Sequence, residues 1–385
     1  MDIYLDSNAT TAVLPQARIA ALSAMEQVYG NPSSTHASGL RARALIDETR
    51  ALARQVLNIA DGDLLFTSGA TEGIQTAVLS ALSELKRRRA AGETIPTDLL
   101  YGATEHKAVP EALHHWNGVL GLNLAVIAIP VNSDGRHDLA WLEQHIGKAG
   151  LVCTMVANNE TGVVSDLRGI SKIVKESGAL WLVDSVQALG KVQVNFADLG
   201  VDYAPFSGHK LCAPKGIGLL FVREGAPFTP LLAGGGQENG MRSGTENMTG
   251  IAALGAVLQA LGSPGVFAPP DALEGRRERL AAALRAVFPG IRFNAAFNIS
   301  LPTTLNFSVP GMSSKMLIDL FDASGIRVSG GSACSASKAE PRFAELVAFL
   351  RGVVAPATAA WQQRADESLL MACRRVTLHD SASFT

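Results

Sequence analysis

Short apolar runs alternate with helical patterns through the middle of this chain, and this alternation constrains the fold more than any other feature. Apolar segments of strand length occur at residues 63–67, 98–101, 123–129, 151–156 and 180–183, with helical patterns at 71–89 and 106–116. Strands that are apolar on both faces are typical of a mostly parallel sheet covered by helices. The sequence therefore predicts an α/β fold with a mostly parallel sheet flanked by helices.

A second, smaller domain is expected after a change in composition. The segment 262–270 is rich in glycine and proline, which interrupt regular structure. Beyond it, the pattern predicts helices at 272–287 and 313–323 and short strands near 291–293 and 304–308. We expect a large domain of residues 14–261 and a small α+β domain of residues 1–13 and 262–385. The assignment of the N-terminal residues to the small domain comes from the family resemblance described below.

Composition narrows the class of protein. Of 385 residues, 47% are apolar and 18% charged, which favours a well-buried globular enzyme. A net charge of −2 gives no reason to expect nucleic acid or an anionic membrane as a direct partner. No apolar run approaches the ~20 residues needed to span a bilayer, and the N-terminus lacks the features of a signal peptide. The cysteines lack metal-ligand spacing, so we expect reduced thiols, no metal site and a cytoplasmic protein.

Polar residues stand at the ends of several predicted strands, where a parallel sheet binds its ligands. Thr67 and Asp184 close two strands, and Lys210 ends a Ser-Gly-His-Lys sequence after a third. A lysine can form a Schiff base with an aldehyde cofactor, and a buried aspartate can keep a pyridine nitrogen protonated. Taken singly, Asp184 would be a helix N-cap and Lys210 a solvated loop residue. Together, Asp184, Gln187 and Lys210 predict three contacts to one pyridoxal 5'-phosphate (PLP).

A turn of small residues, Thr-Ser-Gly-Ala-Thr at 67–71, lies between a predicted strand and a predicted helix. Small residues let the backbone approach a phosphate, and the free N–H groups at a helix start attract negative charge. One glycine-containing turn is weak evidence, since turns need glycine anyway. Its position directly after a strand favours a phosphate site.

Cys334 lies in a run of glycine, serine and alanine at 328–337. Such a run buries little surface, so the sequence predicts an exposed, mobile loop. A free cysteine is usually a small core residue, but this run offers no core. An accessible thiol on a loop suits a nucleophile that meets a substrate and then carries sulfur away.

Taken together, these segments resemble the class V aminotransferase family. The motifs are Asp-Ser-Val-Gln at 184–187, Ser-Gly-His-Lys at 207–210 and the Cys334 run, and the similarity extends from about residue 3 to 341. Within the family, the chain is similar to cysteine desulfurases of the iron–sulfur assembly type. The resemblance implies a PLP-transferase fold of type I, PLP as cofactor, L-cysteine as substrate and a homodimer.

The resemblance also implies roles for single residues. The residues that would hold the PLP phosphate and ring hydroxyl are Ala70, Thr71, Ser207, His209, Gln187 and, reaching the partner subunit's phosphate, Thr245. His106 would stack on the ring and move a proton to the departing sulfur, as a planar imidazole that titrates near neutrality can. Without the other motifs, His106 would be a half-buried loop residue. Asn159 would contact the substrate side of the cofactor, with Asn158 as the alternative.

The implied reaction begins when free L-cysteine displaces Lys210, whose amine then removes the Cα proton. The Cys334 thiolate attacks the substrate sulfur, giving a persulfide and alanine. After residue 341 the resemblance decays. The candidate for binding the substrate carboxylate is Arg375, with Arg364 and Arg374 as alternatives.

Two other functions stay open. The chain could be a PLP lyase or aminotransferase that acts on another amino acid, such as selenocysteine, or a PLP-binding subunit with impaired turnover. Loss of sulfur release on replacing Cys334 would separate the first alternative from a desulfurase. The sequence does not identify the sulfur acceptor, which we expect to be a protein such as an iron–sulfur scaffold or a sulfur carrier. That carrier could serve iron–sulfur assembly, tRNA thiolation or DNA sulfur modification.

Overall fold

A computed structural model of the protein describes residues 2–330 and 376–378. The chain forms two compact units. The larger contains Ala12–Ala157 and Ser165–Gln259, and the smaller contains Met1–Thr11, Asn158–Val164 and Ala260–Thr385. The membership of Asn158–Val164 in the smaller unit was not indicated by the sequence pattern. None of the helices among the described residues is both long and apolar enough to cross a membrane.

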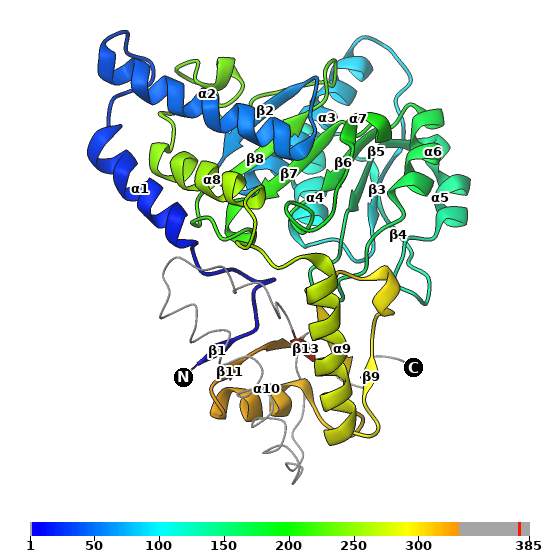
Figure 1. The fold of residues 1–385 in the computed structure, drawn as a ribbon. Coiled ribbons are helices and arrows are strands. Elements are labelled where there is room, and N and C mark those ends of the chain that lie inside the picture. The colour runs from blue at the N-terminus through cyan, green and yellow to red at the C-terminus, as the bar shows by residue number, and fades with distance from the viewer. Residues whose placement is uncertain (1, 331–375, 379–385) are drawn as a thin grey trace. The chain divides into compact units, whose positions relative to one another are not determined.

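The larger unit is built around a seven-stranded sheet (Figure 1). Its strands are β2 (Asp63–Thr67), β3 (Asp98–Gly102), β4 (Ala125–Ile129), β5 (Ala149–Met155), β6 (Leu180–Asp184), β7 (Tyr203–Ser207) and β8 (Gly218–Val222). Its helices are α1 (Pro15–Gln27), α2 (Ala37–Leu57), α3 (Ala70–Ala90), α4 (Ala108–Leu120), α5 (Leu139–His145), α6 (Leu167–Ser177), α7 (Phe196–Leu199) and α8 (Met248–Leu261). Aspartates cap two of them: Asp138 accepts from the Trp141 N–H at 3.0 Å, and Asp166 accepts from the Gly169 N–H at 2.9 Å.

The strand order of this sheet is β2-β8-β7-β6-β5-β3-β4. Strand β8 runs antiparallel to both of its neighbours, and the other neighbouring pairs are parallel. The predicted α/β fold with a mostly parallel sheet is therefore confirmed. Strand β8 was not predicted, because its residues follow a glycine-rich turn. Its first residue, Gly218, pairs with Thr67 on one side and Ser207 on the other, so the ends of β2 and β7 meet there.

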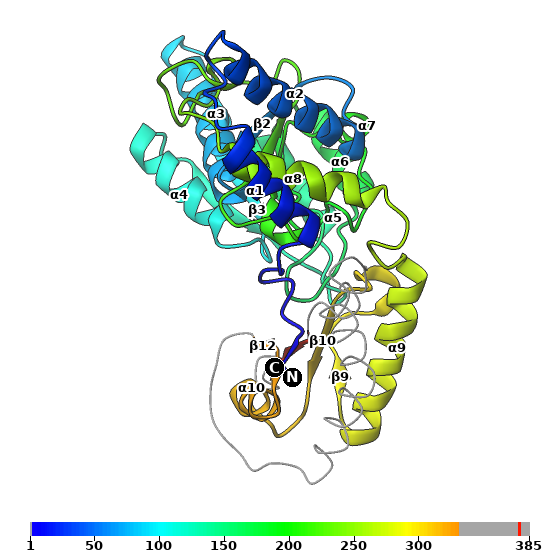
Figure 2. The same cartoon turned by 60° about the vertical axis from the view of Figure 1, so that its left-hand side comes forward.

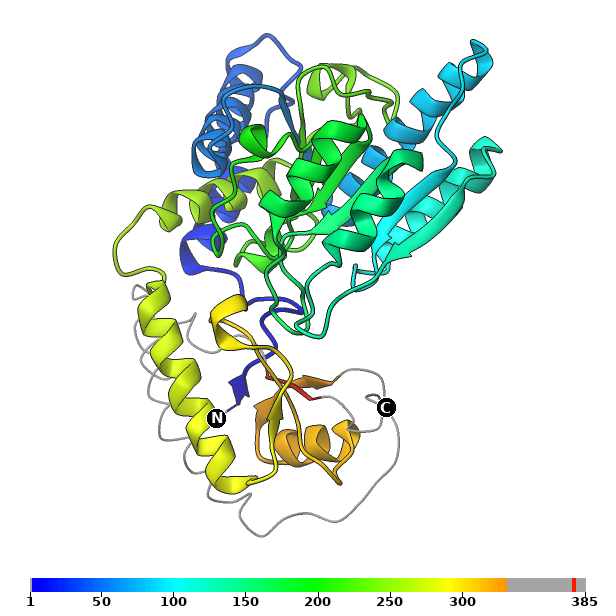
Figure 3. The ribbon, with the colours of Figure 1, turned by 90° about the vertical axis from the view of Figure 1, so that its right-hand side faces the viewer.

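Helices cover both faces of the sheet. Right-handed crossovers place α3 and α4 on one face and α5, α6 and α7 on the other, because the chain reverses its direction across the sheet after β4 (Figure 3). Helices α1 and α8 lie side by side in Figures 1 and 2. A Cβ atom added at Gly255 of α8 would lie 2.8 Å from Thr49 of α2, so glycine permits the close approach of these two helices.

The smaller unit has its own sheets and core. Its strands are β1 (Ile3–Tyr4), β9 (Arg292–Phe293), β10 (Leu305–Ser308), β11 (Ile326–Arg327), β12 (Ser329–Gly330) and β13 (Val376–Leu378), and its helices are α9 (Pro270–Val287) and α10 (Ser314–Ala323). Strand β1 pairs with β11, and the other four strands form a sheet in the order β12-β13-β10-β9. Side chains of α9, α10 and β10 share one apolar core, which includes Leu284, Phe307 and Phe321.

Candidate active site

Lys210 lies directly beyond the end of β7. The strand is buried along its whole length and is followed by a short 3-10 turn, Gly208–Lys210. A Cβ atom at Gly208 would lie 3.0 Å from the carbonyl oxygen of Ile217, so the turn passes too close to its neighbour for a larger residue. Lys210 is half-buried at this position. The fold therefore presents a lysine at the C-terminal edge of the sheet.

Asp184 ends the neighbouring strand β6 and is only 6% exposed. Its Oδ1 accepts a hydrogen bond from the Val186 N–H at 2.9 Å. Burial raises the pKa of Asp184 above its ordinary value, whereas the Val186 N–H and the nearby charges of His106 and Lys210 act in the opposite direction. The structure thus brings Asp184, His106 and Lys210 into one electrostatic neighbourhood.

The other residues around Asp184 occupy the turns that follow β3 and β6. His106 precedes α4, and its Nδ1 accepts a hydrogen bond from the Ala108 N–H at 3.1 Å. Gln187 follows Asp184 on the next turn and is 3% exposed. The Lys191 ammonium donates to the Gln187 side-chain oxygen. These contacts fix two of the predicted site residues on rigid turns at the same edge of the sheet.

The predicted phosphate turn lies between β2 and α3. Ala70 is the first residue of α3 and is buried, and Thr71 is exposed on its first turn. A Cβ atom at Gly69 would lie 3.6 Å from the Ser207 hydroxyl oxygen, which shows that Ser207 faces this turn. The space between them is bounded by the N–H groups of a helix start and by a hydroxyl group, and both of these bind phosphate oxygens.

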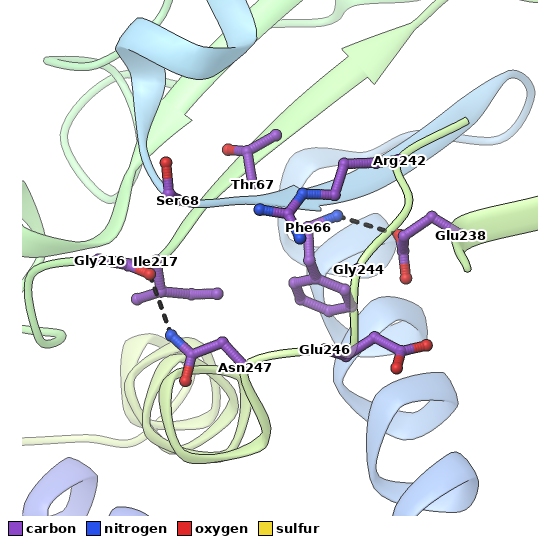
Figure 4. Close-up of a pocket in the computed structure, with 10 residues that line it drawn as sticks. All are labelled: Phe66, Thr67, Ser68, Gly216, Ile217, Glu238, Arg242, Gly244, Glu246 and Asn247. Atoms are coloured by element: carbon purple, nitrogen blue, oxygen red, sulfur yellow. Dashed lines mark hydrogen bonds between the residues drawn. The ribbon is translucent and has the colours of Figure 1, made fainter. Parts of the chain in front are cut away.

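A loop that precedes α8 contacts the end of β2, where Glu238 accepts a hydrogen bond from the Phe66 N–H at 3.1 Å (Figure 4). Ion pairs also hold this loop. The Arg242 Nε atom donates to Glu72 at 2.9 Å, and Glu72 also accepts from the Ser68 N–H at 2.8 Å. Earlier in the same loop, Glu238 forms an ion pair with Arg50, with an N–O distance of 2.7 Å. A small pocket opens between the loop and the turn, and these contacts position its lining.

His209 and Thr245 complete the predicted residues of the larger unit. Burial, together with the nearby charges of Lys210 and Lys215, lowers the pKa of His209 to about 4. The imidazole is therefore neutral at neutral pH and can donate a hydrogen bond without carrying a charge. Thr245 is exposed on the loop that carries Arg242.

The two candidate asparagines belong to the smaller unit. The side-chain oxygen of Asn158 accepts hydrogen bonds from the Glu160 and Thr161 N–H groups at 2.9 and 2.8 Å, which makes it part of a turn. The backbone oxygen of Asn159 accepts from the Asn8 side chain at 3.3 Å. The choice between Asn159 and Asn158 as the residue that contacts the cofactor stays a prediction.

Two predicted residues cannot be placed. Cys334 and Arg375 both lie outside the described residues, as do the alternatives Arg364 and Arg374. Residues 376–378, directly after Arg375, form strand β13, which pairs in parallel with β10 and β12.

Comparison with known proteins identifies the family. The sequence profile described as "Aminotransferase class-V" matches residues 3–352. The chain belongs to the class V aminotransferase family. A cysteine desulfurase from Cereibacter sphaeroides is 37% identical over 361 residues, covering 93% of this chain and 88% of the relative. A cysteine desulfurase from a Nostoc strain is 37% identical over 342 residues, covering 88% of this chain and 82% of the relative. A solved NifS-like protein superposes with a TM-score of 0.78 at 29% identity, covering 92% of this chain and all of that one.

These findings confirm the predicted resemblance to class V aminotransferases and, within them, to cysteine desulfurases. They also confirm the predicted fold. Members of this family use PLP. The ion pair of Arg242 with Glu72 in this class V aminotransferase was not predicted, because the two residues lie far apart in the chain. The repeated acidic and basic residues near the glycine-rich loop were the only available signal.

Proposed function

We propose that this class V aminotransferase is a PLP-dependent cysteine desulfurase, which releases sulfur from L-cysteine and leaves L-alanine. One observation carries the proposal. Asp184, His106 and Lys210 come together at the edge of the sheet where parallel strands bind ligands, beside a helix start suited to a phosphate. The cysteine desulfurases among its relatives support the choice of substrate.

The residues at this edge fit PLP. At Gly69, whose φ of +156° favours glycine, the turn that starts α3 lies next to the Ser207 hydroxyl group, so N–H donors and a hydroxyl group are available together to a phosphate. Asp184 is a buried carboxylate whose charge burial disfavours, so a protonated ring nitrogen would be a suitable partner. The neutral imidazole of His209 can donate a hydrogen bond to a phosphate oxygen. When bound, PLP supplies an electron sink for the charge that develops at the substrate Cα.

Each of these side chains would have a separate role in the reaction. Lys210 would hold the cofactor covalently, and its free amine would take the proton from the substrate Cα. Asp184 would favour a proton on the ring nitrogen, and Gln187 would bind the ring hydroxyl group. His106 would stack on the ring and supply a proton to the departing sulfur. Asn159 would contact the substrate side of the ring.

Sulfur transfer is assigned to Cys334. Its thiolate attacks the substrate sulfur, so that an S–S bond forms as the C–S bond breaks. The electron pair of the broken bond stays with the substrate carbon, which takes up a proton to become alanine. The persulfide on Cys334 then passes its outer sulfur to an acceptor protein, an iron–sulfur scaffold or a sulfur carrier, in the cytoplasm. Arg375 binds the substrate carboxylate with two parallel hydrogen bonds.

A homodimer is part of the proposal. Helix α1 exposes a stripe of apolar side chains, with Ile19, Leu22 and Met25 between 52% and 61% exposed. Such a stripe supports a protein–protein interface. Thr245 lies exposed on a firmly anchored loop, in keeping with a role at the partner's phosphate. Sedimentation of the loaded protein tests this point, since an active monomer would contradict it.

The experiment that tests the function measures alanine formation from L-cysteine. The wild-type chain, loaded with PLP, should form alanine and, with a thiol reductant, sulfide. Cys334→Ala should retain PLP but lose both products. Alanine formation by Cys334→Ala at the wild-type rate would instead favour a lyase that needs no persulfide. A wild-type chain that binds PLP and forms no alanine would refute the desulfurase activity.

A further inference from the structure

A buried polar pair includes a carboxyl group that interacts electrostatically with Asp184. The Glu105 side chain is completely buried, and the His137 side chain is 3% exposed. The Nε2 atom of His137 lies 3.9 Å from the Glu105 Oε1 atom. Within the described part of the chain, neither ring nitrogen of His137 has a hydrogen-bond partner, and neither Glu105 oxygen has a side-chain partner. Buried polar atoms without partners are rare, so the two ring nitrogens of His137 need an explanation.

The backbone makes room for both side chains. A Cβ atom at Gly102, the last residue of β3, would lie 2.2 Å from His137 Nε2 and 3.0 Å from Glu105 Oε1. His137 is held in place by an isolated β-bridge to Val131. The absence of a side chain at Gly102 thus makes room for the imidazole and the carboxyl group. Two apolar side chains of the same volume would fill this room without leaving buried polar atoms unpaired.

The charged groups around the pair come from several elements. Asp184, on β6, and the Cys153 thiol, on β5, both interact electrostatically with Glu105. The Met155 N–H, also on β5, points to Glu105. His106 and Lys210 act on Asp184, which is the carboxylate that would meet the cofactor ring.

Two buried carboxylates that repel each other disfavour the state in which both are charged. Burial and the charge of Asp184 raise the pKa of Glu105 well above its ordinary value. Burial lowers the pKa of His137 to about 4. Burial also raises the pKa of Asp184, but the Val186 N–H, His106 and Lys210 act in the opposite direction. The negative charge therefore belongs on Asp184, and the proton belongs on Glu105.

We propose that Glu105 is protonated beside a neutral His137. This uncharged pair would keep the negative charge on Asp184, the residue that would contact the cofactor ring. His137 offers an acceptor for the Glu105 proton on the side away from Asp184. A rotation of the Glu105 side chain shortens the 3.9 Å separation to the ~2.7 Å of a hydrogen bond. Without that acceptor, the proton turns toward Asp184 and competes with the ring nitrogen for its oxygens. The role toward the cofactor rests on the proposed function, whereas the protonation of the pair does not.

The first test needs neither PLP nor cysteine. The infrared spectrum of the apo chain at neutral pH should contain the carbonyl stretch of a protonated carboxyl group, and Glu105→Gln should lose it. Asp202→Asn is the matched control, because the Asp202 side chain is also buried, at 4% exposed, but is paired with Arg223. It should lose only carboxylate bands. An identical protonated-carboxyl signal in wild type and Glu105→Gln would overturn the proposal, whatever the enzyme does.

Unfolding measurements provide a second test of the same point. A carboxyl group whose pKa is raised by folding destabilises the folded chain progressively as pH rises above the unfolded pKa. Glu105→Gln removes that effect, so its gain in melting temperature over wild type should grow between about pH 5 and pH 8. A gain that does not change with pH would contradict a proton on Glu105.

The role of His137 is tested by a pair of variants. His137→Leu removes the acceptor and should weaken PLP binding about fivefold, the effect of one hydrogen bond, and shift the carboxyl band. His137→Gln supplies an amide oxygen and should restore both. If the two variants have the same PLP affinity and the same band, His137 serves only packing and the proposed positioning is wrong. Failure of the whole enzyme to bind PLP would instead refute the proposed function and leave the infrared result standing.

Discussion

Replacement of Asp184 by asparagine separates the effect of its charge on the empty protein from its effect on the cofactor. In the apo chain the carboxylate is buried, and its pKa is raised by that burial. A raised pKa means that the charged form is disfavoured in the folded state, so stability is lost as pH rises from about 4 through the folded pKa. Asp184→Asn lacks this loss. The apo variant should therefore be at least as stable as wild type at neutral pH.

The loaded protein should behave in the opposite way. Asparagine keeps the shape of the side chain and can still accept from the Val186 N–H, but it offers the ring nitrogen no charge. A hydrogen bond to a charged partner contributes about 2 kcal/mol. PLP should then bind about 30-fold more weakly. Turnover should fall by more than this factor, because the unprotonated ring is a poor electron sink.

The assay combines PLP titration, followed by visible absorbance, with thermal unfolding of apo and loaded protein. Asp202→Asn is the control, since Asp202 is a buried aspartate that bonds the Trp181 N–H at 2.7 Å and pairs with Arg223. It should lower stability by about 1–3 kcal/mol and leave PLP affinity unchanged. If Asp184→Asn binds PLP as tightly as wild type and forms alanine at the same rate, the placement of Asp184 under the ring is wrong.

Three further predictions concern other parts of the site. Lys210→Ala should fold and bind PLP without a covalent link, so that borohydride fixes no cofactor to the chain; fixation to the variant would mean that another lysine is used. Gly218→Ala would place a Cβ atom 2.4 Å from a backbone oxygen and should cost about 2–4 kcal/mol of stability, measured by denaturant unfolding, whereas Gly275→Ala meets nothing within 4 Å and should be neutral or stabilising. Arg375→Ala should raise KM for cysteine and should reduce kcat/KM by a factor that corresponds to about 2–4 kcal/mol of transition-state stabilisation. Its PLP affinity should not change. Wild-type kinetics would mean that another arginine binds the substrate carboxylate.

Many elements of the larger unit could be predicted, because the sequence patterns that indicate them each lie within a short segment. The apolar strands that end at Thr67 and Asp184 and the turn that carries Lys210 are each visible within a few residues. The order of the strands is not local, and so the antiparallel strand that begins at Gly218 was missed. A strand that starts with glycine after a glycine-rich turn has no pattern of its own.

Some features of the candidate site could not be predicted, because they also depend on contacts between residues that are distant in sequence. Glu105 is next to His106 in sequence and was passed over, because nothing local reveals that His137 approaches it. That contact depends on a bridge beyond β4 and on the missing side chain of Gly102. Asn159 was predicted from a motif, but its place in the smaller unit depends on pairing of Val163 with Ser300, which is again remote in sequence.

The insertion of β8 between β2 and β7 has a consequence for synthesis of the protein. The phosphate turn follows β2, near the start of the chain, but β2 has no neighbour in the sheet until Val222 at the end of β8 has been made. Pairing between distant segments is slow and forms late, whereas β3, β4, β5 and β6 can assemble as the chain emerges. A nascent chain arrested before β8 should therefore have a partial sheet and no capacity to capture PLP. In the proposed PLP complex, the cofactor would therefore bind only after the ribosome has passed the last strand of the larger unit.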